Sequence, residues 1–265
     1  MSDTKEDNAQ LVLTPSLGRA FLGLWSFEWQ TRMTPGKLAQ SAALVVVIPI
    51  LMFIALKEGQ KREFIDWIVT YHLFLMLPIY CLSVFGPVIR DELQSDTLGF
   101  IITRPIKRYS LLILKYLCTM IWSQVLVLLC GLLFFVVALV HGYEVDPTMI
   151  GLFLLVQALA VMAYGAISCL LGLLTKKYMV LGIVYGLVVE KGIGSIPTNI
   201  HSLAISHHLK SILGNHQWMS DQFTLTGEPI VPAIGWVILA AATFLSVAAL
   251  LFNTLEYNHS DEMQK

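Results

Sequence analysis

Charge is scarce in this chain of 265 residues, of which only 13% are Asp, Glu, Lys or Arg, whereas soluble domains contain about a quarter. The scarcity is concentrated in five stretches of 19 to 27 residues that hold no charged side chain. They cover residues 38–56, 67–89, 116–140, 149–175 and 229–255. Since a helix needs roughly 20 apolar residues to cross a bilayer, this pattern excludes a soluble domain and a disordered chain. It predicts an all-α polytopic membrane protein.

The chain also lacks the motifs of several enzyme classes. It has no G-x-x-x-x-G-K-[ST] phosphate loop, no G-x-S-x-G elbow and no H-E-x-x-H zinc motif. We therefore expect no cofactor in this chain. An ion-coupled carrier usually has several ionisable side chains in its spans, and here only His72, Lys115, Glu190 and Lys191 qualify. Energy for uphill movement would therefore come from another subunit.

The cysteines indicate neither a metal site nor a disulfide. The four cysteines, at 81, 118, 130 and 169, all lie in the apolar stretches without paired spacing. They are predicted to be packing residues and neither metal ligands nor disulfide partners. Free thiols are consistent with an inner (cytoplasmic) membrane.

A sixth span is predicted at about 178–196, although Glu190 and Lys191 interrupt it. With six spans and the acidic N-terminal segment placed in the cytoplasm, 12 Lys and Arg side chains lie inside and five outside. This positive-inside bias supports two cytoplasmic termini. The predicted organisation is a cytoplasmic N-terminal segment at 1–37, a transmembrane domain at 38–255 and a cytoplasmic tail at 256–265, with no cleaved signal peptide expected.

Two segments outside the spans have helical spacing. Residues 11–35 predict an interfacial helix that places Trp25 and Trp29 at headgroup depth and ends at Pro35, or alternatively an irregular lead-in. Residues 195–228 predict one or two short external helices. Their histidines, His201, His207, His208 and His216, are expected to be solvated or interfacial, with a metal site as the less favoured alternative.

The most informative segment follows the second span. Apolar residues recur at helical spacing from 88 to 103, acidic residues come early and basic residues late, which suits a helix dipole. Pro105 forces the preceding residue out of a helix. The pattern predicts a short amphipathic helix at the inner membrane surface, then a sharp turn back into the membrane. A helix resting on lipid headgroups without a partner is the alternative.

This segment resembles the membrane subunits of ABC transporters of the type-2 exporter class, six-span permeases that dimerise and dock two separate ATPase subunits. The matching residues are Glu92, Thr97, Pro105, Arg108 and Lys115, and Asp96 replaces the usual Gly. A second likeness covers 185–212, with Tyr185 to Glu190, Pro197 and the run from Ser206 to Leu209.

The resemblance implies that 88–103 is a coupling helix that docks on a cytoplasmic ABC ATPase. That partner would bind the ATP and Mg and hydrolyse the nucleotide, so this chain is not itself expected to be an enzyme. A homodimer or pseudo-dimer that moves an amphiphilic or lipid-like substrate is implied, with membrane lipid and no nucleic acid as further partners. The expected docking residues are Glu92, Leu93, Asp96, Thr97, Phe100, Arg104, Pro105 and Arg108.

Other residues keep two interpretations. Glu190 and Lys191 are candidates for a substrate route, or they pair with each other or with water at the interface. The G-x-x-x-G of Gly182 and Gly186 suits either a dimer seam or packing within the chain. Lys115 is expected to snorkel towards the inner surface. A membrane-embedded enzyme and a non-transporting adaptor remain the alternative functions.

Overall fold

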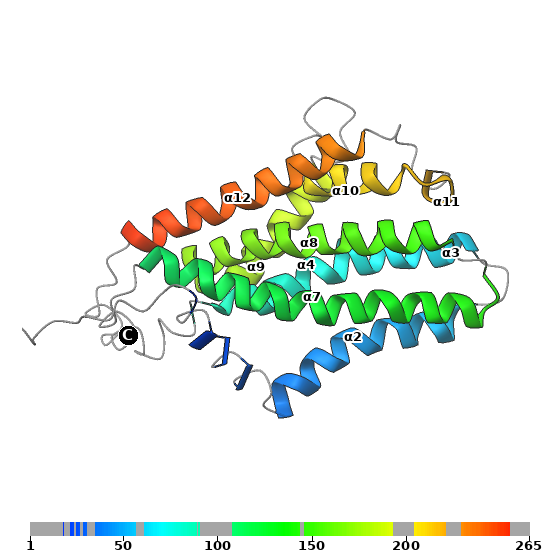
Figure 1. Ribbon diagram of the computed structural model, residues 1–265, viewed down its shortest axis with the longest axis horizontal. Coiled ribbons are helices and arrows are strands. Elements are labelled where there is room, and N and C mark those ends of the chain that lie inside the picture. The colour runs from blue at the N-terminus through cyan, green and yellow to red at the C-terminus, as the bar shows by residue number, and fades with distance from the viewer. Residues whose placement is uncertain are drawn as a thin grey trace, which may run out of the picture.

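Long helices lie side by side in the computed structural model, which describes residues 35–56, 61–88, 90, 108–143, 146–192, 204–220 and 229–254 and scattered positions between 18 and 30 (Figure 1). The described secondary structure is entirely helical, which confirms the predicted fold class. The longest elements are α2 (Pro35–Ala55), α7 (Arg108–Val140), α8 (Pro147–Leu174) and α12 (Ile230–Thr254).

Four helices in the described part of the chain are long and apolar enough to cross a membrane: Arg62–Phe85, Tyr109–Val140, Pro147–Leu174 and Ile230–Thr254. Two shorter apolar helices, Val46–Ala55 and Tyr178–Glu190, fall in the other two predicted spans. The structure therefore supports an integral multi-pass protein, and the count of six spans stays a prediction.

The second and fifth predicted spans both contain π-helical turns. The second consists of α3 (Lys61–Asp66), η1 (Trp67–Met76) and α4 (Leu77–Phe85), and the fifth of α9 (Tyr178–Tyr185) and η2 (Gly186–Gly192). In the second span Pro78 follows η1 and lacks an N–H, so the widened register relieves its crowding against the preceding turn.

Helix α8 is the centre of the bundle and packs against α4, α7, α9, α10 (Ile205–Leu213) and α12. Small residues such as Ala160, Ala163 and Ala166 are fully buried, which lets neighbouring helices approach closely. Gly165 lies against the Phe85 ring, and Gly172 lies against the backbone of Gly86. These contacts fix α4 against α8.

The turns gather at the two ends of the bundle (Figure 1). At one end, the His141 ring lies 3.2 Å from the Leu56 carbonyl oxygen, and the Phe64 and Tyr143 rings lie 5.5 Å apart. At the other end, the close of α4 meets the end of α8 and the start of α9. This grouping matches the two predicted sets of loops, although which set faces the cytoplasm stays a prediction.

One local prediction was wrong, and it concerns Lys115. Pro35 begins α2, because a proline is tolerated in the first helical turn, where N–H groups have no intrahelical acceptor. Residues 31–34, where the preceding helix was predicted to end, lie outside the described residues. Lys115 is only 2% exposed on α7 and does not snorkel. Among the scattered N-terminal positions, Trp29 packs edge-on against Trp122 of α7 with ring centroids 5.3 Å apart.

The contact between Gly172 and Gly86 yields a stability prediction. A Cβ at residue 172 would overlap the Gly86 carbonyl, so Gly172→Ala should destabilise the fold by about 2 kcal/mol or more. Gly151→Ala is the matched control, because its Cβ meets no neighbour and alanine favours a helix by about 1 kcal/mol. Thermal unfolding of the purified protein should separate the two variants, and equal midpoints would contradict the proposed packing.

Candidate functional site

A cavity lies between η1, α4, α8, α9, η2 and α10, and we call it the lateral cavity. Its volume is about 200 Å³, far more than the roughly 10–15 Å³ that one water needs. Most of its wall is apolar, from residues such as Phe74, Leu82 and Ile167. Its polar lining comes mainly from Tyr164, Tyr185, Glu190, Ser206 and Lys210.

Glu190 is held in place by neighbours on two elements. The Ser206 backbone N–H donates a 2.8 Å hydrogen bond to Oε2, and the Tyr185 hydroxyl donates a 3.2 Å bond to Oε1. The Ser206 hydroxyl also donates to the Glu190 backbone oxygen at 3.4 Å. These bonds tie η2 to the first turn of α10, and they place a carboxylate in the wall of the cavity.

Lys210 brings the opposite charge to the same cavity. It lies one helical turn after Ser206, so the two side chains share a face of α10. Its Nζ is 5.0 Å from the centre of the Phe74 ring, a cation–π arrangement with η1. The cavity wall thus contains both an acidic and a basic side chain.

The lateral cavity reaches the apolar outer surface of the bundle. Leu75 of η1, Ile183 of α9 and Leu187 of η2 all line it, yet they are 39%, 48% and 58% exposed. Side chains that line a cavity and face outward form its rim. In a membrane this rim would open towards lipid acyl chains.

A second polar cluster is buried in the core. The Gln157 side-chain amide donates to the Val127 carbonyl oxygen at 2.6 Å and lies 3.0 Å from Nε2 of His72. His72 also lies 4.0 Å from the Cys130 sulfur and edge-on against Phe134. Because this cluster joins η1, α7 and α8 with little free space around it, we interpret it as a packing device and not as part of a transport route.

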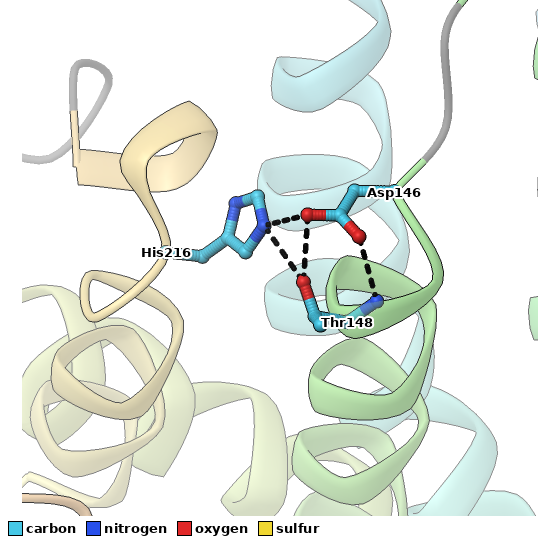
Figure 2. Close-up of polar contacts among 3 residues, drawn as sticks. All are labelled: Asp146, Thr148 and His216. Carbon is cyan, nitrogen blue, oxygen red and sulfur yellow. Dashed lines mark hydrogen bonds and ion pairs between the residues drawn. The ribbon is translucent and has the colours of Figure 1, made fainter.

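At the end of the bundle where α7 turns into α8, three residues form a polar clip (Figure 2). Asp146 caps α8 by accepting hydrogen bonds from the Thr148 backbone N–H at 3.0 Å and from its hydroxyl at 2.7 Å. His216, just before α11 (Gln217–Ser220), lies 3.3 Å from both the Asp146 carboxylate and the Thr148 hydroxyl. The clip therefore fastens the segment after α10 to the start of α8.

The structure revises the interpretation of the external histidines. His207 and His208 are buried on α10, and the His208 ring stacks on Trp236. They are therefore not solvated, and a position at the membrane interface stays a prediction. Their burial follows from the packing of α10 between α8 and α12. His216 meets a carboxylate, Asp146, that lies 70 residues away in the sequence. Within the described residues no group of three or more metal-ligating side chains is found.

The G-x-x-x-G motif spans the end of α9 and the start of η2, and one of its two glycines packs within the chain. Gly182 is buried against the Leu82 side chain, whereas a Cβ on Gly186 would point into open space. Gly182 and Gly186 both line the lateral cavity. A dimer seam at these glycines stays a prediction.

The predicted docking residues lie almost entirely outside the described part of the chain. This applies to Glu92, Leu93, Asp96, Thr97, Phe100, Arg104 and Pro105, whereas Arg108 is the first residue of α7. Glu190 belongs to the cavity wall, and Lys191 follows it within η2.

A comparison of the sequence with known protein families covers most of the helices that form the lateral cavity. Residues 32–190 match the sequence model of a family described as ABC-2 family transporter protein. The chain belongs to this family of transporter membrane proteins. The matched region contains η1, α4, α8 and α9, as well as the predicted docking segment. No curated protein matches the chain.

The clip of this ABC-2 protein yields a pH prediction. Thr148, through its hydroxyl and its N–H, and then His216 lower the pKa of Asp146 below its ordinary value of 3.8. A lowered carboxylate pKa adds stability that is complete above 3.8 and is lost as the pH falls through the lower folded value. Asp146→Asn retains a capping side chain without the charge. Wild type should unfold at a higher midpoint than Asp146→Asn at neutral pH, and the difference should shrink as the pH falls below 3.8.

Circular dichroism of both proteins across this pH range provides the measurement. A difference that stays unchanged to the lowest pH, or that is absent at neutral pH, would contradict a stabilising role for the Asp146 charge.

Proposed function

We propose that this chain is the permease subunit of an ATP-driven ABC transporter that moves an amphiphilic or lipid-like substrate outward across the membrane. The observation that carries the proposal is the family match over residues 32–190. Separate cytoplasmic ATPase subunits would dock on the coupling helix at 88–103, and two copies of the permease, or one copy and a related chain, would form the pore.

The packing around the docking segment supports force transmission. The segment connects α4 with α7 at the end of the bundle where α8 also ends (Figure 1). The Phe85 ring of α4 lies 5.5 Å from the Tyr116 ring of α7, and the Tyr116 hydroxyl donates a 2.7 Å hydrogen bond to the Met162 carbonyl oxygen of α8. A push on the segment would therefore move three packed helices together.

The same helices form walls of the lateral cavity. Leu82 lies on α4, one turn before the Gly86 contact, and Tyr164 lies on α8 next to Gly165. Displacement of α4 against α8 would change the shape of the cavity. This arrangement connects an external ATPase to a binding space without an ATP site in the permease itself.

The docking role is tested by co-purification of the partner ATPase. Glu92→Ala and Phe100→Ala, separately and combined, should reduce the ATPase recovered with the permease about tenfold, the equivalent of about 1.4 kcal/mol. Glu63→Ala is the matched control, because Glu63 is an exposed acidic residue on α3 at the opposite end of the bundle. Undiminished recovery with the double variant would contradict docking on 88–103.

A further inference from the structure

We propose that the lateral cavity binds a single-chain zwitterionic amphiphile, with its headgroup between Glu190 and Lys210 and its chain along the apolar wall. The inference rests on the proposed transport function for its biological meaning, because it names the substrate class that the permease would accept. Binding itself depends only on the residues of this chain.

The charges of Glu190 and Lys210 determine which kind of headgroup the cavity would bind. A carboxylate and an ammonium group line the same small space next to apolar walls. The formal charges of the two side chains sum to zero, so a ligand with one net charge would bring an unbalanced charge into a medium of low dielectric constant, which is costly. A headgroup that has one positive and one negative group adds no net charge. Charge complementarity therefore favours a zwitterion over an anionic or a cationic headgroup.

Glu190 retains the capacity to bind such a group. An ionised carboxylate offers about four lone-pair sites. Tyr185 and the Ser206 N–H donate to it. These donors orient the carboxylate without occupying every acceptor site. A ligand ammonium or quaternary amine can add to this set.

The apolar wall and the rim determine which apolar chain the ligand would have. The volume of about 200 Å³ is below the roughly 300–1,000 Å³ of pockets for drug-sized ligands, which favours one alkyl chain over two. The exposed rim residues Leu75, Ile183 and Leu187 provide a lateral opening through which a chain can extend into the bilayer.

The two π-helical segments support a binding site and argue against a simple packing defect. Thr70, Phe74 and Leu75 of η1 line the cavity, and so do Leu187 and Glu190 of η2. π-helical turns are rare and occur frequently at functional sites. Here both described π segments contribute to the same cavity.

The headgroup is tested with three single-chain probes of equal chain length: zwitterionic dodecylphosphocholine, anionic dodecyl phosphate and cationic dodecyltrimethylammonium. The purified full-length chain, kept in a nonionic maltoside detergent, should bind the zwitterion about tenfold more tightly than either charged probe in a competition assay. Glu190→Gln should weaken zwitterion binding about tenfold and reverse the preference towards the anion, and Lys210→Met should reverse it towards the cation.

The location of the binding site in the lateral cavity is tested with a variant whose side chain fills the cavity. Gly186→Leu adds a side chain where a Cβ meets no neighbour, so the fold should tolerate it while the cavity is blocked. Gly235→Leu is the matched control, because it is equally open but lies on α12 outside the cavity. Gly186→Leu should lose at least about tenfold in affinity for the zwitterion, whereas Gly235→Leu should bind like wild type.

Equal binding of the three probes by wild type, or equal binding by the two leucine variants, would overturn the proposal. ATPase recovery, measured on the same preparations, separates it from the transport role. Failed probe binding with normal ATPase recovery would overturn the zwitterion site alone. Selective probe binding by a wild-type chain that recovers no ATPase would overturn the transport role and leave the site established.

Discussion

The structure depends on one constraint: hydrocarbon provides no hydrogen-bond partners, so each polar group inside the bundle must be satisfied by the protein. Backbone groups meet this requirement in long helices. Side-chain groups form hydrogen bonds across helices, as when Gln157 bonds to Val127 next to His72, and when Glu190 accepts from the Ser206 N–H. The two polar sites differ in their surroundings. The cluster of His72 and Gln157 borders a space of only about 30 Å³, whereas Glu190 borders the lateral cavity of about 200 Å³.

This difference connects the fold with its proposed use. A buried polar cluster that forms hydrogen bonds across helices specifies how the helices fit together. A carboxylate that is oriented by Tyr185 and α10 but faces open space can also meet a ligand. Since α8 packs against α4 and α7 and forms one wall of the cavity, movement at the predicted docking segment would reach this space through contacts such as Gly172 against Gly86. In the proposed function, this movement would drive transport.

Hydropathy alone predicted α8, α12 and the part of α7 from residue 116 onward well, because each occupies a long charge-free stretch. It did not predict η1 and η2, since a hydropathy pattern does not report the hydrogen-bond register within a helix. The sequence marked Glu190 as a candidate but not Ser206 or Lys210, which come near it only when α10 folds back against the bundle. The clip of Asp146 and His216 was missed for the same reason, as 70 residues separate them. The docking residues at 92–105 stay a prediction from the resemblance, because they lie outside the described residues.

The most direct test of the central claim, that a cytoplasmic segment between α4 and α7 receives force from outside this chain, is sidedness. The four native cysteines are buried, so they contribute little background to a membrane-impermeant maleimide. In intact cells Gln217→Cys at the opposite end of the bundle should be labelled, and Asp96→Cys should be labelled only after the membrane is opened. Labelling of Asp96→Cys in intact cells, with protection of Gln217→Cys, would contradict the account.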